Sequence, residues 1–143
     1  MKIIEFNEEE NSKNLNRILL GHLAERTHLK TRNESSISLA AFEEDNYIGG
    51  ITAQKVFETC FVDLLAVEKK YQELGVGRKL ILELENEVKR HGCKKIFLTT
   101  QDYQARRFYE KMGYSVVFEL NDIPFEGTTR IFLIKGIYVK FKD

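Results

Sequence analysis

The spacing of apolar residues predicts three helices along the chain. The strongest pattern covers residues 76–91, where one stripe of aliphatic side chains repeats at helical intervals: Val76, Leu80, Ile81, Leu84 and Val88. A shorter helix is expected over residues 103–112, just before Gly113. Another follows Asn7, a residue type that suits a helix N-cap. The apolar positions of this first helix predict one buried face: Leu15, Ile18, Leu19 and Leu23.

Shorter apolar runs between these helices predict about seven β-strands. They cover residues 3–6, 37–42, 47–56, 60–67, 96–100, 114–120 and 130–141. The run at 60–67, CFVDLLAV, is apolar except for Asp63, as expected of a central strand that is covered on both faces. Because helices alternate with strands, we expect an α/β protein with a mixed sheet flanked by helices. Its length favours a single domain over residues 1–143.

Composition and charge exclude several functional classes. Lysine plus arginine and aspartate plus glutamate both number 22, so no overall basic field indicates nucleic-acid binding. No run approaches the ~18 apolar residues of a membrane span, and the N-terminus does not resemble a secretion signal. A cytoplasmic location is therefore expected. Cys60 and Cys93 lie far apart with no Cys/His cluster, which predicts reduced thiols and no metal site.

The candidate chemistry is concentrated in residues 63–78, where an apolar strand leads through a turn into the strongest predicted helix. The first backbone amides of a helix lack intrahelical partners and lie at the positive end of its dipole, so they can bind a phosphate. Gly75 and Gly77 would leave these amides accessible, and Arg78 would add positive charge. The same glycines could instead serve only a tight turn, and the residues alone favour neither interpretation.

Other nucleotide-binding motifs fit this segment poorly. The chain has no GxxxxGK[ST] sequence, which excludes a P-loop. Leu80 stands where a dinucleotide-binding fingerprint requires its third glycine. A nucleotide-dependent oxidoreductase is therefore disfavoured.

Two segments resemble motifs of the GNAT superfamily of N-acetyltransferases. Residues 72–77, QELGVG, resemble the family's Q/R-x-x-G-x-G/A motif and likewise stand between an apolar strand and a long helix. Residues 104–114, QARRFYEKMGY, resemble its N-x-x-A-x-x-F/L-Y-E-K-x-G-F/Y pattern at the matching distance downstream. The resemblance extends over residues 39–139 and is closest to a group of small bacterial members.

This resemblance implies the GNAT fold, a mostly antiparallel sheet splayed between its fourth and fifth strands, here residues 60–67 and 96–100. Acetyl-CoA would lie where these strands separate, with its pantetheine arm along the first and its pyrophosphate at the glycine turn. The implied cofactor-binding residues are Leu65, Ala66, Val67, Gln72, Glu73, Leu74, Gly75, Val76, Gly77, Arg78, Gln104 and Phe108. Asp102 stands where the family often has asparagine, which leaves open whether Asp102 or Gln104 contacts the arm.

Tyr109 is the first candidate for the chemistry. By resemblance it would stand near the coenzyme sulfur, where a phenol with an ordinary pKa of ~10 is protonated and can act as the general acid. Without the resemblance, Tyr109 would be interpreted as an aromatic residue packed beside Phe108.

Asp63 is the second candidate, because it is the sole ionisable residue inside the central strand. Strand alternation predicts that it shares a face with Phe61, Leu65 and Val67. Some family members have a catalytic glutamate at the position that aligns with Phe61, so that residue is absent here. Asp63 could be the base that deprotonates the amine, with its pKa raised by burial. It could equally be a structural carboxylate.

The function implied by the resemblance is an acetyl-CoA-dependent N-acetyltransferase that acts on a primary amine by direct attack in a ternary complex. The alternative is a non-catalytic acyl-CoA-binding or regulatory module on the same fold, against which Tyr109 argues. The expected partners are acetyl-CoA and an amine acceptor, with neither nucleic acid nor membrane. The apolar last strand would permit a homodimer if it lay at a sheet edge.

Overall fold

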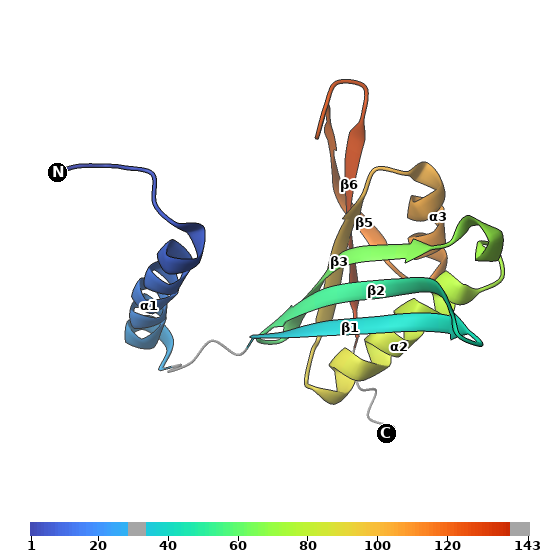
Figure 1. Ribbon diagram of the computed structural model, residues 1–143, viewed down its shortest axis with the longest axis horizontal. Helices are drawn as coiled ribbons and strands as arrows, with labels where there is room; N and C mark the ends of the chain where they lie inside the picture. Colours follow the sequence, from blue (N-terminus) through green and yellow to red (C-terminus); the bar gives the residue numbers. More distant parts are fainter. Residues whose placement is uncertain (29–33, 138–143) are drawn as a thin grey trace. The chain divides into compact units, whose positions relative to one another are not determined.

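The computed structural model describes residues 1–28 and 34–137. The chain divides into two compact units, Met1–Asn33 and Glu34–Asp143 (Figure 1). None of the described helices combines the length and the apolar composition needed to cross a bilayer.

The N-terminal unit contains one helix, α1 (Glu8–Thr27). The predicted cap is confirmed, because the Asn7 side chain accepts a hydrogen bond from the Glu10 N–H at 3.0 Å. The predicted strand at residues 3–6 is wrong: these residues pair with no strand among those described, and a strand needs a partner to satisfy its backbone groups. No residue of α1 is buried within its own unit, and the buried face expected of Leu15, Ile18, Leu19 and Leu23 stays a prediction.

The larger unit is built on a six-stranded mixed sheet with the order β1-β2-β3-β4-β6-β5. Its strands are β1 (Glu34–Glu43), β2 (Asn46–Val56), β3 (Thr59–Val67), β4 (Lys95–Thr100), β5 (Ser115–Asn121) and β6 (Thr129–Gly136). The α/β class is confirmed with six strands rather than seven. Strand β6 lies between β4 and β5, so the edge position on which the homodimer expectation depends is wrong. Residues 138–141 of the predicted last strand lie outside the described residues.

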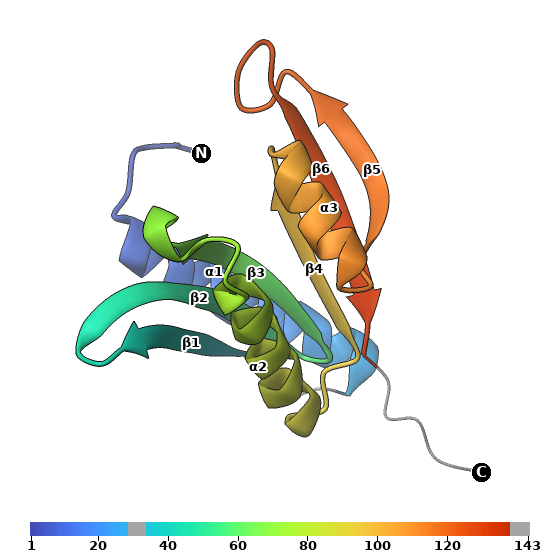
Figure 2. The same ribbon diagram turned by 90° about the vertical axis from the view of Figure 1, so that its right-hand side faces the viewer.

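The sheet is splayed between β3 and β4, as the resemblance implies. These two strands pair in parallel through three residue pairs, which end at Phe61 and Phe97. Strand β3 continues to Val67 and β4 to Thr100, and Figure 2 shows the strands diverging beyond their shared base. The other pairings, β1–β2, β2–β3, β4–β6 and β5–β6, are all antiparallel.

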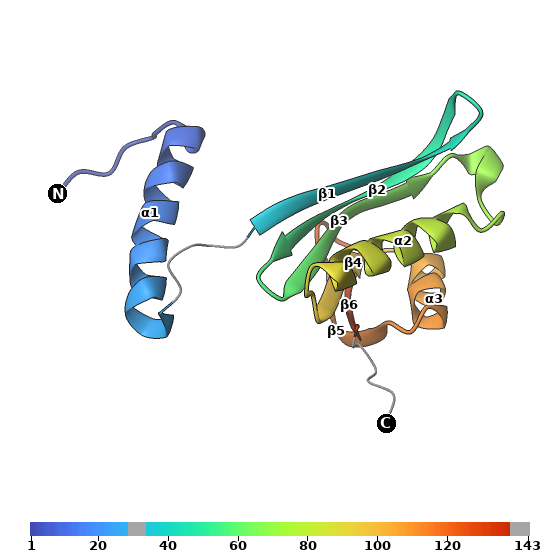
Figure 3. The ribbon, with the colours of Figure 1, turned by 90° about the horizontal axis from the view of Figure 1, so that it is seen from below.

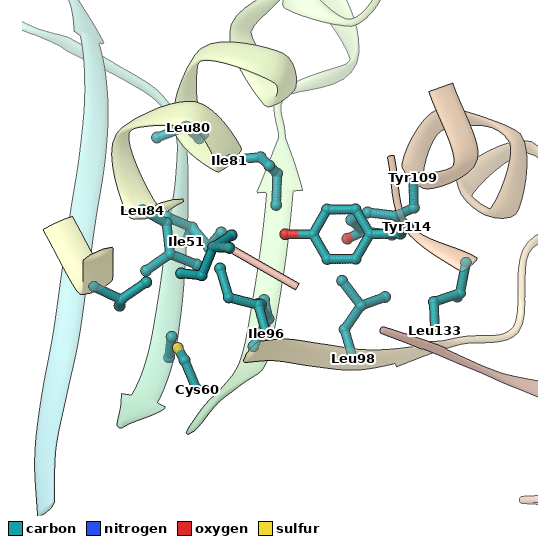
Figure 4. Packing of buried hydrophobic residues seen from close by; sticks show 14 of the residues in the cluster. Ile51, Cys60, Leu80, Ile81, Leu84, Ile96, Leu98, Tyr109, Tyr114 and Leu133 are labelled. Atoms are coloured by element: carbon teal, nitrogen blue, oxygen red, sulfur yellow. The ribbon is translucent and has the colours of Figure 1, made fainter. Parts of the chain in front are cut away.

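Two helices cover the sheet, and both contribute to one core. Helix α2 (Val76–Arg90) packs on β1, β2 and β3, and α3 (Tyr103–Lys111) packs on β4 and β5 (Figure 3). The predicted stripe of α2 is confirmed, since its buried apolar residues are Leu80, Ile81, Leu84 and Val88. Figure 4 shows Leu80, Ile81 and Leu84 of α2 beside Ile51, Ile96 and Leu98 of the strands.

Candidate functional site

A β-bulge at Asp63 interrupts the alternation of side chains along β3, so the residues beyond it face the opposite sides of the sheet from those that a regular strand would give them. Ala53 of β2 pairs with Val62 and Thr52 pairs with Leu64, so Asp63 is the extra residue. The bulge interrupts strand alternation, and the expectation that Asp63 shares a face with Leu65 and Val67 is wrong. Its carboxylate is exposed, so the expected burial is absent. The Gln54 side-chain amide donates a hydrogen bond to Asp63 Oδ2 at 3.3 Å.

The end of β3 offers backbone groups on the side from which β4 has diverged. The Glu68 N–H donates to the Ile48 carbonyl at 2.8 Å, which makes the preceding pair, Val67 and Gly49, a non-hydrogen-bonded one. The N–H and C=O groups of Val67, and of Leu65 two residues earlier, therefore point away from β2. Gln72 Nε2 donates to the Val67 carbonyl at 3.0 Å and fixes the following turn against this strand end.

The turn from β3 to α2 has the geometry of an anion site. It contains a short 3₁₀ helix, η1 (Lys69–Tyr71), and reaches α2 through Gly75, the N-cap, whose φ of 83° suits glycine. No side chain caps α2. Its first backbone hydrogen bond runs from the Lys79 N–H to the Gly75 carbonyl at 3.1 Å. The amides of Val76, Gly77 and Arg78 therefore lie at a helix N-terminus outside the intrahelical ladder.

Gly77 brings the two sequence motifs into contact. A Cβ atom at this position would lie 3.5 Å from Phe108 Cζ and 3.8 Å from Val67 Cγ2. The start of α2, the end of β3 and helix α3 thus meet where β3 and β4 diverge. From the sequence, the proximity of these three segments could be predicted only through the family resemblance.

Asp102 and Gln104 have different roles at the start of α3. Asp102 is the N-cap, and its carboxylate accepts a hydrogen bond from the Gln104 N–H at 2.7 Å. The Gln104 side chain is exposed and makes no hydrogen bond within residues 1–28 and 34–137. The Asp102 carboxylate is thus used to cap the helix, whereas the Gln104 side-chain amide is free to contact a ligand.

Tyr109 is buried in the core, with 7% of its surface exposed. Its ring lies edge-on to Phe108 at 5.1 Å and to Tyr114 at 5.7 Å between centroids. Burial raises the pKa of Tyr109 to about 12, so its hydroxyl is protonated at neutral pH. That hydroxyl donates to no protein group in the described part of the chain, and unlike that of Tyr114 it is not sealed from solvent.

A polar cluster beside Tyr109 was not predicted from the sequence. Lys135 Nζ on β6 donates to Glu85 Oε1 at 2.6 Å and to the Met112 carbonyl at 2.7 Å, which links α2, α3 and β6. The Tyr114 hydroxyl is buried and lacks a hydrogen-bond partner in the described structure. Burial, followed by the nearby Glu85 carboxylate, raises the pKa of Tyr114. The sequence did contain one signal for this cluster: Glu85 stands four residues after Ile81, so a carboxylate falls on the apolar stripe of α2.

Within the described residues, no group of histidine, cysteine and carboxylate side chains is arranged to hold a metal ion. Cys60 and Cys93 are both free and buried. The candidate site is therefore formed by the backbone at the end of β3, the N-terminus of α2 and the aromatic residues of α3.

The fold combines a splayed mixed sheet with a glycine-capped helix after one diverging strand and a short tyrosine-bearing helix after the other. This combination is typical of a class of acyl-transfer proteins. The chain matches the model of the Acetyltransferase (GNAT) family over residues 3–114 and belongs to that family. It is 31% identical over 99 residues to blasticidin-S acetyltransferase of Streptomyces morookaense, an alignment that covers 68% of this chain and 72% of the relative.

Solved structures agree with this assignment. An acetyltransferase from Bacillus cereus ATCC 14579 has a TM-score of 0.81 and 27% identity, covering 95% of this chain and 97% of the other. An aminoglycoside 6'-N-acetyltransferase complexed with coenzyme A has a TM-score of 0.68 and 22% identity, covering 99% and 100%. The latter likeness supports the fold alone.

Proposed function

We propose that residues 1–143 form a single N-acetyltransferase domain that transfers an acetyl group from acetyl-CoA to a primary amine. The observation that carries this proposal is the meeting of Val67, Gly77 and Phe108 where β3 and β4 diverge. The cosubstrate is acetyl-CoA, in keeping with the family and with the coenzyme A complex of a similar fold.

The residues at this meeting point offer hydrogen-bonding groups that match the pantetheine arm and the pyrophosphate of acetyl-CoA. The outward-pointing backbone groups of Leu65 and Val67 would pair with the amides of the pantetheine arm, as an added strand does. The N-terminal amides of α2 would take the pyrophosphate, with Arg78 adding charge. The exposed Gln104 amide is placed to contact the arm.

Tyr109 would act as the general acid. In a direct transfer the amine nitrogen forms a bond to the acetyl carbon, the carbon–sulfur bond breaks, and the sulfur leaves with its electron pair. A phenol with a pKa of about 12 holds its proton at neutral pH and can pass it to that sulfur. The proton lost by the amine would go through water to Asp63, whose exposed carboxylate is held by Gln54.

The relatives support an amine as the acceptor without defining which one. One curated relative acts on blasticidin-S, and another, from Haemophilus influenzae, acts on an alanine of ribosomal protein bS18. The acceptor of this chain is therefore proposed only as a primary amine. The cytoplasmic location stays a prediction, and a homodimer through the last strand is no longer supported because β6 is not at a sheet edge.

A screen of amines tests the proposed function. The full chain would be incubated with acetyl-CoA and one amine at a time from a set of polyamines, amino acids, aminoglycosides and an alanine-terminated peptide. Free thiol would be measured, and mass spectrometry would identify the acetylated product. We expect at least one amine to increase thiol release and to gain one acetyl group. Binding of acetyl-CoA with no turnover on any amine would instead support the non-catalytic module.

A further inference from the structure

The face of the sheet opposite α2 and α3 carries two opposite charges just beyond the point where β3 and β4 diverge. The last paired residues, Phe61 and Phe97, have ring centroids 5.0 Å apart. Two residues further along each strand stand Asp63 and Thr99. Arg130 of β6 donates through NH1 to Thr99 Oγ1 at 2.7 Å, which places its guanidinium beside this part of β4.

The burial pattern shows that these side chains share one face. Gln54 is the cross-strand partner of Phe61 and bonds to Asp63, so all three lie over the same side of β2 and β3. On β4, Ile96 and Leu98 are buried in the core, and Phe97 and Thr99 alternate with them. On β6, Ile131 and Leu133 are buried, which puts Arg130 on the side opposite the core.

Each charge is oriented by a neutral partner rather than by a counter-ion. Ser36 donates to Gln54 Oε1 at 3.0 Å, and Gln54 in turn donates to Asp63, which forms a chain across β1, β2 and β3. Thr99 holds Arg130 in the same way. Among the described residues, neither Asp63 nor Arg130 has an ion-pair partner. Lys95, also on this face, lies at the level of Thr59, at the paired base of the two strands.

We propose that this face binds the acceptor as a small zwitterion, a compound with both an ammonium and a carboxylate group, such as a free amino acid. The ammonium would be held by Asp63 and the carboxylate by Arg130, whose planar guanidinium suits two parallel hydrogen bonds. The rings of Phe61 and Phe97, which pack against each other, would together contact an apolar side chain of the ligand. This inference rests on the proposed function, since the same ammonium supplies the amine that is acetylated.

A binding experiment in a dead-end complex tests the inference. The full chain would be saturated with coenzyme A, which carries no acetyl group, at pH 7. Three probes would then be titrated by NMR: L-phenylalanine with both charges, phenethylamine with the cation alone and 3-phenylpropanoate with the anion alone. We expect L-phenylalanine to bind most tightly, with shifts at the Gln54 side-chain amide and at Phe97.

Variants separate the two charges. Arg130→Gln keeps a donor for Thr99 but removes the charge, so it should weaken L-phenylalanine about tenfold to a hundredfold and leave phenethylamine unchanged. Asp63→Asn should weaken L-phenylalanine similarly and leave 3-phenylpropanoate unchanged. Arg130→Lys should recover part of the affinity. Arg90→Gln, the same change at the far end of α2, should alter none of the three, and thermal melting would show that each variant is folded.

The possible failures are distinguishable. Equal binding of the three probes, or a variant that weakens all three equally, would overturn the zwitterion site. Specific binding of phenethylamine alone would also overturn it, in favour of a simple cation site. Failure of coenzyme A itself to bind would count against the proposed function, and repeating the titrations without coenzyme A would still test the face directly.

Discussion

Tyr109 shows how a residue's environment decides its chemistry. The phenol is buried beside Phe108 and Tyr114, and desolvation raises its pKa to about 12. A group with so high a pKa stays protonated near neutral pH and so has a proton to donate, although it is a weaker acid than an exposed phenol. The same burial fits a packed aromatic residue, so a measurement of rate is needed to separate the two roles.

Replacing Tyr109 by phenylalanine keeps the ring and removes the donor. We expect kcat on a productive amine to fall about 10²–10⁴-fold, the range for a positioned acid, while the Kd for acetyl-CoA changes little. Stopped-flow or steady-state thiol release would measure kcat, and calorimetry would measure Kd. Tyr103→Phe is a matched control that removes an exposed hydroxyl from the same helix. Wild-type turnover in Tyr109→Phe would mean that another group protonates the sulfur.

The pH dependence of stability has a defined sign at this residue. The pKa of Tyr109 is raised from 10 in the unfolded chain to about 12 in the folded one. The folded state therefore holds the proton more tightly, and this stabilisation is complete below pH 10 and lost as pH rises towards 12. The loss amounts to about 3 kcal/mol for one such group. Denaturant unfolding at pH 9 and pH 11.5 should show a smaller decrease in Tyr109→Phe than in the wild type.

Asp63 marks the limit of sequence analysis at the residue scale. The sequence identified it as an exceptional carboxylate in an apolar strand, and alternation correctly put it on the face of Phe61 but wrongly grouped it with Leu65 and Val67. One extra residue in β3 reverses the alternation beyond it, and nothing local in CFVDLLAV indicates a bulge. Arg130 and Gln54 were missed for a related reason: each matters only through residues on other strands.

At the scale of elements, prediction was most accurate where a pattern is long. Helix α2 and the strands of the larger unit were expected within a few residues of their observed bounds, because each buries a repeating apolar face. Residues 3–6 also look like a strand, yet a strand exists only with a partner. The splay between β3 and β4 depends on packing between distant segments, so it came from the family resemblance alone.

The ion pair between Lys135 and Glu85 fastens three elements together and gives a prediction at this scale. The exposed fractions of the two side chains are 25% and 9%. Lys135→Met would leave the Glu85 carboxylate buried without its counter-ion and the Met112 carbonyl without a donor. We expect the free energy of unfolding to fall by about 3 kcal/mol, near the low end for a broken buried pair.

Urea unfolding monitored by circular dichroism would measure this change. The exposed Lys111→Met is the matched control and should cost less than about 0.5 kcal/mol. Combining Lys135→Met with Glu85→Leu removes both charges and should recover most of the stability. If the double variant is no more stable than Lys135→Met, the pair is not what holds α2 to β6.

For the whole molecule, the two motifs and their order along the chain are sufficient to indicate the family. QELGVG and QARRFYEKMGY are separated in sequence, but a single fold brings Gly77 against Phe108. The sequence could not indicate that Arg130 lies on the same face of the sheet as Asp63, because Arg130 stands far from either motif. The structure therefore adds Arg130 and its pairing with Thr99, on which the proposed acceptor face depends.

We propose above that acetyl-CoA binds through its phosphates at the N-terminus of α2, at the divergence of β3 and β4. Calorimetric titration of acetyl-CoA into the wild type, Gly77→Ala and Lys89→Glu tests it most directly. A methyl group at Gly77 makes only ordinary contact with Phe108, so the free protein should tolerate it. In the proposed complex it would nevertheless lie beside the amides that the phosphate must reach. We predict one-to-one binding to the wild type, at least tenfold weaker binding to Gly77→Ala, about 1.4 kcal/mol or more, and little change in Lys89→Glu. Absence of binding to the wild type, or equal affinity in Gly77→Ala, would contradict the account.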